Sequence, residues 1–201
     1  MSRFKTLTFD VREHVALITM NRPSVLNAIN GEMRAELRDA WQTVARDDEI
    51  HVAVITGAGD HAFTSGADRS DFESSAGVGS AGHTAESGVI PGSPGAESNL
   101  EHMIAPKSTG CWKPVIAAIN GIACGGAFYI LGEADILIAS DNATFFDPHV
   151  TFGMVSAYES IYMLQRLPLG EVLRMQLSGS AERLSARRAL EIGLVSEAKM
   201  R

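Results

Sequence analysis

Two short glycine-containing segments could present main-chain amides to an anion. Gly125 and Gly126 lack a Cβ atom, so a ligand can approach their backbone closely. A helix is expected to begin at Gly126, where unpaired amides and the helix dipole favour negative charge. Gly66 gives the same access beside Ala67. This arrangement suits stabilisation of a developing oxyanion, although the glycines could equally be simple turn residues.

Other glycine and cysteine patterns exclude several kinds of site. The segment 121–126 lacks the Lys-Ser/Thr pair of a phosphate-binding P-loop, and residues 57–59 lack the third glycine of a dinucleotide-binding turn. Cys111 and Cys124 have neither the paired spacing of a zinc site nor the number needed for a disulfide framework. They are interpreted as reduced, partly buried thiols of a cytoplasmic protein.

The first half of the chain predicts a hairpin, a helix and a strand. Residues 4–10 and 14–20 are expected to form antiparallel strands joined through residues 11–13. Apolar residues at helical spacing predict a helix over 31–46 with one buried face. The run 51–56 predicts a short buried strand, closed by glycines.

The second half alternates strands with helices, after a segment of a different character. Residues 70–99 are rich in Ser, Gly, Ala and Pro, and they predict a long mobile loop that is either a disordered insertion or an active-site lid. A helix is expected near 99–110. The remaining expected elements are strands over 115–119 and 135–140 and helices over 126–132, 157–167, 170–177 and 185–192, with Ser185 as N-cap and Gly193 as C-cap. This alternation indicates an α/β architecture.

Composition and charge narrow the classes of partner. The 201 residues carry a net charge of −7, which disfavours nucleic-acid binding because that requires a basic surface. The first ten residues have no apolar core of a signal peptide, and no apolar run is long enough to cross a membrane. The length and the ordinary globular composition predict one main domain.

Four ordered segments resemble the crotonase (enoyl-CoA hydratase/isomerase) family: residues 21–28 (NRPSVLNA), 62–68 (AFTSGAD), 113–126 (KPVIAAINGIACGG) and 184–195. The resemblance implies a spiral of ββα repeats that forms a single core domain over residues 1–195. Family members usually continue with helices that cover the acyl pocket and help to build a trimer. Residues 196–201 are accordingly interpreted as the start of a shortened or missing C-terminal helical segment, and exposed apolar surface is expected.

The resemblance also implies a substrate and a site. The substrate would be a coenzyme A thioester, with no other cofactor and no metal, in a homotrimer or hexamer. The amides of Ala67 and Gly126 match the two oxyanion-hole donors, which would stabilise a thioester enolate. Residues implied to flank the coenzyme A part are Asn27, Ala28, Phe63, Ser65, Gly66, Asp68 and Gly125. Arg22, Arg69 and Lys107 are candidates for its phosphates.

The sequence departs from the family at the acid and base positions. Hydratases of the family use two glutamates, whereas the matching positions here are Tyr129 and His149. His149 could act as a base because its ordinary pKa lies near neutral pH, or it could only stabilise the turn after Pro148. Tyr129 is expected to be a hydrogen-bond donor or orienting group, and the resemblance implies that Glu159 can also face the pocket.

Two functions from different classes remain open on these residues. The leading one is an enzyme of the family with altered acid/base groups, whose reaction could be hydration, isomerisation or cleavage of a C–C or thioester bond. The alternative, motivated by the missing glutamates, is a non-catalytic acyl-CoA-binding or assembly subunit. Turnover of a thioester distinguishes the two.

Overall fold

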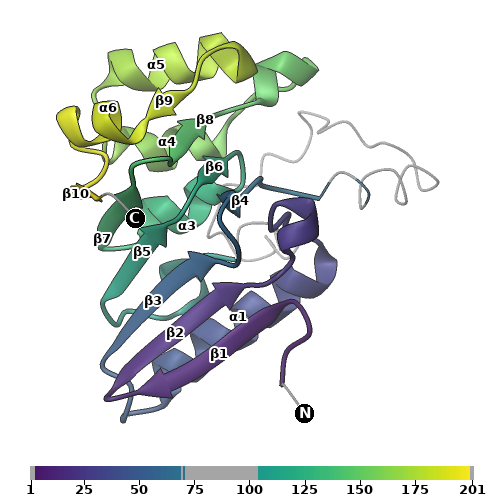
Figure 1. The fold of residues 1–201 in the computed structure, drawn as a ribbon, viewed down its shortest axis with the longest axis vertical. Coiled ribbons are helices and arrows are strands. Elements are labelled where there is room, and N and C mark those ends of the chain that lie inside the picture. Colours follow the sequence, from purple (N-terminus) through teal and green to yellow (C-terminus); the bar gives the residue numbers. More distant parts are fainter. Residues whose placement is uncertain (1–2, 69, 71–103, 200–201) are drawn as a thin grey trace, which may run out of the picture.

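The computed structural model describes residues 3–68, 70 and 104–199, which form two β-sheets flanked by helices (Figure 1). The larger sheet has six strands in the order β1-β2-β3-β5-β7-β10, and the smaller has four in the order β4-β6-β8-β9. The strands of the larger sheet are β1 (Leu7–Arg12), β2 (Val15–Met20), β3 (Val52–Gly57), β5 (Val115–Ile119), β7 (Ile136–Ser140) and β10 (Glu197–Lys199). The strands of the smaller sheet are β4 (Ala62–Thr64), β6 (Ile122–Cys124), β8 (Thr144–Phe146) and β9 (Leu184–Ser185).

The N-terminal hairpin is confirmed, but its turn is shorter than predicted. β1 and β2 pair antiparallel from Leu7 opposite Met20 to Arg12 opposite Val15. Only Glu13 and His14 connect them, with φ angles of 48° and 68°. Two consecutive residues with positive φ make the tight hairpin turn whose twist matches that of the strands, so residues 11 and 12 remain in the ladder instead of in the turn.

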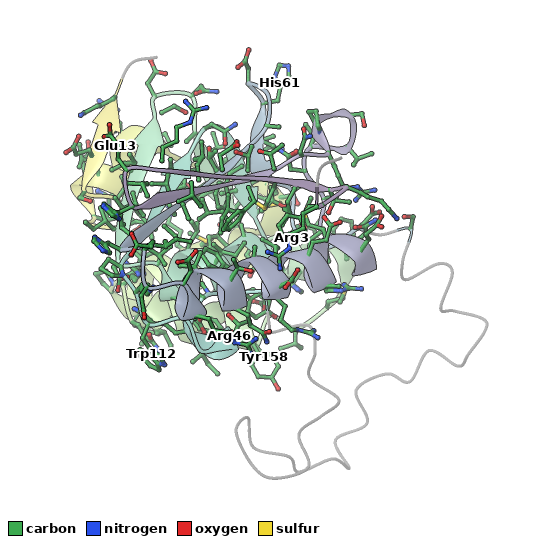
Figure 2. All side chains as sticks on the ribbon, turned by 90° about the horizontal axis from the view of Figure 1, so that it is seen from below. Arg3, Glu13, Arg46, His61, Trp112 and Tyr158 are labelled. Carbon is green, nitrogen blue, oxygen red and sulfur yellow. The ribbon has the colours of Figure 1, made fainter. Side chains whose placement is uncertain are left out.

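Helix α1 (Gly31–Arg46) coincides with the predicted helix. The Asn30 side chain accepts a hydrogen bond from the Met33 amide and begins the helix, while Trp41 donates its indole N–H to the Ile104 carbonyl at 2.8 Å. The apolar face of α1 packs on one side of the larger sheet, as seen from below in Figure 2. Its buried residues are Met33, Leu37, Ala40, Trp41 and Val44.

The smaller sheet is a feature that the sequence did not predict. Three of its strands have three residues and the fourth has two, which is too short for a readable alternation of polar and apolar residues. β4 and β8 pair in parallel with β6 between them. This pairing places the segments after β4, β6 and β8 at the same edge of the sheet, because all three strands run in one direction.

The helices of the second half lie close to their predicted positions, and Figure 1 shows α4, α5 and α6 at the end of the molecule where β8 and β9 lie. They are α3 (Ala127–Glu133), α4 (Tyr158–Leu164), α5 (Leu169–Ser178) and α6 (Ala186–Glu191). The predicted N-cap is confirmed, since the Ser185 side chain accepts from the Arg188 amide. Gly193 follows α6 with a φ of 80°.

Two predicted helical segments differ in the structure. Residues 197–199 form strand β10 instead of starting a helix, because the turn at Gly193 returns the chain alongside β7, where Ala198 pairs with Ala139. Of the expected helix over 99–110 the structure describes residues 104–110, and this part contains the 3-10 turn η3 (Lys107–Thr109), between Pro106 and Gly110, instead of an α-helix. Residues 71–103 lie outside the described part, and the predicted loop over 70–99 falls almost entirely among them.

Candidate active site

The amide of Ala67 is left open by the way its neighbours bond. Ile29 donates its N–H to the Gly66 carbonyl at 2.8 Å and accepts the Asp68 N–H at 3.0 Å. In this parallel bridge Ala67 lies between the two bonds, so its own N–H faces away from Ile29. Thr64 stabilises the turn that leads to Ala67. Its hydroxyl donates to the Asn27 carbonyl at 2.7 Å and accepts the Gly66 N–H at 3.1 Å.

The second amide belongs to Gly126, between β6 and α3. Gly125 has a φ of 52°, and its carbonyl accepts a hydrogen bond from the Phe128 amide at 2.9 Å. Gly126 is the N-cap, and helix α3 begins at the next residue. Gly66, with a φ of 86°, lies against this step: a Cβ atom there would be 2.8 Å from the Cys124 carbonyl oxygen and 3.0 Å from the Gly126 nitrogen. Only glycine fits at position 66, and the two chain segments touch through their backbones.

These contacts bring the Ala67 and Gly126 amides to one place. A Cβ atom built on Gly126 would lie 3.5 Å from the Ala67 nitrogen. Ala67 is exposed and Gly126 half-buried. Within residues 3–68, 70 and 104–199, neither amide donates a hydrogen bond to another group of the chain. Two adjacent, unpaired and accessible N–H groups can bind one anionic oxygen.

A second group of side chains surrounds the fully buried carboxylate of Asp147. Its Oδ1 accepts from His149 Nδ1 and from the His149 amide, the latter at 3.0 Å. Its Oδ2 accepts from Ser156 Oγ at 2.6 Å and from Gln176 Nε2 at 2.9 Å. His149 Nε2 then lies 3.6 Å from Oε1 of the buried Glu159.

The electrostatics of this group favour charge separation between Asp147 and His149. Burial acts to raise the pKa of Asp147, but hydrogen bonds from His149 and Ser156 together hold that pKa below its ordinary value. The hydrogen bond to Asp147 raises the pKa of His149 above its ordinary value, against burial and with help from the charge of Glu159. The two shifts together favour an ion pair between the Asp147 carboxylate and a His149 imidazolium.

The two groups are neighbours. A Cβ atom on Gly125 would lie 3.7 Å from Cδ of Pro148, the residue between Asp147 and His149. The turn η4 (His149–Phe152) that begins with His149 is thus packed against the Gly125–Gly126 step. Side chains capable of proton transfer therefore lie next to two open amides, an arrangement that a reaction through an oxyanion requires.

Tyr129, the other predicted acid/base position, is buried in α3. Its ring packs edge-to-face on Tyr162 of α4, with ring centroids 5.6 Å apart. The Tyr162 hydroxyl donates to Glu133 at 3.0 Å, and burial, followed by the charge of Glu133, raises the pKa of Tyr162. A Cβ atom on Gly132 would lie 2.6 Å from the Tyr162 ring. The close packing of α3 on α4 therefore fixes the positions of the two helices relative to each other.

Several predicted coenzyme A contacts have side chains that bond within the protein. Asn27 is fully buried, and it donates to the Ala58 and Ala62 carbonyls and accepts from the Arg22 amide. Phe63 is fully buried in the core. Their side chains hold the loop that carries Ala67, so any ligand contact at these positions would involve the neighbouring backbone.

The predicted phosphate-binding cations are also paired. Arg22 donates to Asp68 at 2.7 Å and to the Ala28 carbonyl, and the bond from Arg22 lowers the pKa of Asp68. Lys107 pairs with Asp135 at 2.7 Å. Arg69 lies outside the described residues. Of the other predicted contacts, Ser65 is half-buried and accepts from Cys124 Sγ at 3.1 Å through its carbonyl oxygen.

Ser156 and Gln176 are site residues that the sequence did not reveal. Gln176 lies 29 positions from the aspartate that it contacts, and no motif joins the two. One signal was present on α5: Gln176 is a polar residue four positions after the buried Val172 and next to the buried Met175. A polar side chain beside a buried helix face requires a hydrogen-bond partner.

Comparison with known proteins decides the family. Residues 10–200 match the Enoyl-CoA hydratase/isomerase family. The chain belongs to the enoyl-CoA hydratase/isomerase family of enzymes. The chain is 35% identical over 192 residues to (E)-benzylidenesuccinyl-CoA hydratase from Thauera aromatica, covering 95% of the chain and 68% of that protein. It is 34% identical over 183 residues to a short-chain-enoyl-CoA hydratase from Clostridium acetobutylicum, covering 91% of the chain and 64% of that protein.

Solved structures confirm the predicted crotonase fold. A crystal structure of an enoyl-CoA hydratase/isomerase from Mycobacterium paratuberculosis superposes with a TM-score of 0.80 at 38% identity, covering 98% of this chain and 70% of that one. The chain spans about two-thirds of the length of the two curated relatives. Among the described residues, no helix is long and apolar enough to cross a lipid bilayer.

Proposed function

We propose that this member of the enoyl-CoA hydratase/isomerase family binds a 2-enoyl-CoA thioester and stabilises its enolate between the amides of Ala67 and Gly126. The observation that carries the proposal is the 3.5 Å approach of a Gly126 Cβ position to the Ala67 nitrogen, with both amides unpaired in the described structure. Negative charge that develops on the thioester oxygen would be met by preorganised donors. Each such donor contributes roughly 3–4 kcal/mol to lowering the barrier.

His149 and Glu159 are proposed to move the protons in place of the glutamate pair of the family's hydratases. Both side chains are largely buried, and they face each other at 3.6 Å beside the Gly125–Gly126 step. A base and an acid at this position suit addition of water, with its oxygen bonding to C3 and a proton to C2. The relatives named above are hydratases, which favours hydration over isomerisation or bond cleavage.

A panel of 2-enoyl-CoA thioesters with short, branched and aromatic acyl groups tests this function. Mass spectrometry should show products heavier by one water molecule, formed faster by the unsubstituted protein than by His149→Gln. The matched control is His61→Gln, at an exposed position after β3. Measurable coenzyme A binding without turnover across the panel would instead support the non-catalytic acyl-CoA-binding subunit.

No further cofactor is required by this chemistry. The amides of Ala67 and Gly126 supply charge stabilisation, His149 and Glu159 supply proton transfer, and coenzyme A enters as part of the substrate. Turnover that survives exhaustive dialysis against a chelator is the expected result. Turnover that stops, and returns with added metal, would contradict this part of the proposal.

Assembly into a homotrimer or hexamer is proposed in addition. Helix α5 carries Leu169, Leu173 and Leu177 at four-residue spacing, and they are 59%, 46% and 75% exposed. Three leucines on one exposed helical stripe favour burial against another surface. Light scattering coupled to size exclusion should give three or six chains per particle, whereas a monomer would contradict the proposal. A cytoplasmic location remains a prediction.

A further inference from the structure

Both ring nitrogens of His149 face carboxylate oxygens. Nδ1 bonds Asp147 Oδ1, and Nε2 lies 3.6 Å from Glu159 Oε1. An ionised carboxylate can only accept hydrogen bonds, so a proton on each ring nitrogen satisfies both contacts. The alternative places that second proton on Glu159. The two atoms lie 3.6 Å apart, beyond hydrogen-bond length, so a proton would pass between them through one bridging water or after a small movement of the side chains.

Hydrogen-bond donors from three parts of the chain stabilise the negative charge of Asp147. Its two oxygens receive four donors: the side chain and amide of His149 at the start of η4, Ser156 before α4, and Gln176 on α5. A carboxylate with several donors keeps its charge despite burial. Ser156 Oγ also lies 3.4 Å from Glu159 Oε2, but its single proton is donated to Asp147 at 2.6 Å.

Few other charges reach this group in the described part of the chain. Cys124, on β6, lies near Asp147, and burial raises the pKa of its thiol to about 12, so the thiol is neutral. Arg183, beside β9, stacks over the Phe146 ring at 4.4 Å. The charge state of His149 is therefore set by Asp147 and Glu159.

We infer that Asp147 is a positioning residue that keeps His149 as the proton donor of the site, and that Ser156 and Gln176 fix Asp147 in that role. This inference rests on the proposed hydration. Glu159 would accept a proton from water as its oxygen bonds to C3 and the electron pair moves onto the thioester oxygen. His149 Nε2–H would then protonate C2 of the enolate. Proton transfer from Glu159 to His149 restores both groups.

Ring ¹⁵N chemical shifts of histidine-labelled protein test the positioning directly. The His149 signal is assigned by its loss in His149→Gln. In the unsubstituted protein both ring nitrogens should be protonated at pH 6.5, with a midpoint above the ordinary 6.5. Asp147→Asn should move that midpoint down by at least about one unit, and Ser156→Ala and Gln176→Ala by less. Gln165→Ala, at the exposed end of α4, is the matched control and should change nothing.

A neutral His149 ring at pH 6.5, or a midpoint that Gln176→Ala and Ser156→Ala leave unchanged, overturns the inference, and both measurements stand even if Asp147→Asn fails to fold. The pH profile of kcat gives a second readout: Gln176→Ala should shift the alkaline limb, where His149 loses its proton, to lower pH. Absence of turnover by the unsubstituted protein defeats the proposed function and the donor role together. Turnover with an unmoved alkaline limb defeats the inference alone.

Discussion

Gly126 faces the amide of Ala67 so closely that a single methyl group would fill the space between them. The Cβ position at 126 lies 3.5 Å from the Ala67 nitrogen, which is ordinary van der Waals contact, and the φ of Gly126 is −55°. Alanine can therefore be accommodated without backbone strain. Its methyl group would nevertheless cover an N–H that is otherwise open.

Gly126→Ala should thus fold normally and lose activity. Covering one oxyanion donor is expected to lower kcat roughly 100- to 1,000-fold, while the midpoint of urea unfolding stays close to that of the unsubstituted protein. Gly170→Ala is the control, because a Cβ atom there meets nothing within 4 Å. Equal activity of the two variants would show that the amide of Ala67 does not contact the substrate.

The Asp147–His149 pair should make stability depend on pH in two directions. The raised pKa of His149 adds stability that is complete below pH 6.5 and is lost as pH rises through the folded value. The lowered pKa of Asp147 adds stability that is complete above pH 3.8 and is lost as pH falls through the folded value. The pair therefore contributes most between these two ordinary values.

His149→Gln should remove the alkaline part of that dependence. Urea unfolding from pH 6 to 9 is expected to show a smaller loss of unfolding free energy for His149→Gln than for the unsubstituted protein. His61→Gln, at an exposed histidine outside this group of side chains, should follow the unsubstituted curve. Parallel curves for all three proteins would be inconsistent with a raised His149 pKa.

Gly132 controls how closely α4 approaches α3. A Cβ atom there would lie 2.6 Å from Tyr162 Cβ, so Gly132→Ala should destabilise the protein by about 1–3 kcal/mol through overpacking. Helix propensity alone predicts that Gly132→Ala stabilises the protein, since alanine is favoured over glycine in a helix by about 1 kcal/mol. The free energy of unfolding measured in urea shows whether overpacking or helix propensity dominates.

The double substitution Gly132→Ala with Tyr162→Ala is the control for this mechanism. Tyr162→Ala removes Cδ1 and Cγ, which would lie 2.6 Å and 2.8 Å from the new methyl group, but it keeps Cβ at 2.6 Å, so the cost of Gly132→Ala should fall in part without vanishing in that background. An unchanged cost in that background would mean that the destabilisation arises elsewhere than at the α3–α4 contact.

Much of the larger sheet and its covering helix could be predicted from local pattern. Apolar residues recur at helical spacing along the sixteen residues of α1, and Met33, Leu37 and Val44 all lie on its buried side. β5 was predicted with its observed bounds. Long or strongly apolar segments carry enough residues for the pattern to show.

The approach of the site segments depends on contacts that no local pattern encodes. β4 and β6 have three residues each, yet their pairing brings Gly66 against Cys124 and Gly126. Gln176 reaches Asp147 only because α5 packs against η4. The family resemblance pointed to Ala67, Gly126 and His149 as site residues. The hydrogen bonds around Asp147 became known only from the folded structure.

The carbonyl stretch of a bound thioester tests the central claim most directly. Butyryl-CoA labelled with ¹³C at the thioester carbonyl binds as an unreactive analogue, and isotope-edited infrared spectra report how strongly its oxygen is polarised. The account predicts a shift to lower frequency on binding to the unsubstituted protein, and a loss of most of that shift in Gly126→Ala at saturating ligand. A bound ligand whose carbonyl frequency equals that in water, or whose shift persists in Gly126→Ala, would contradict it.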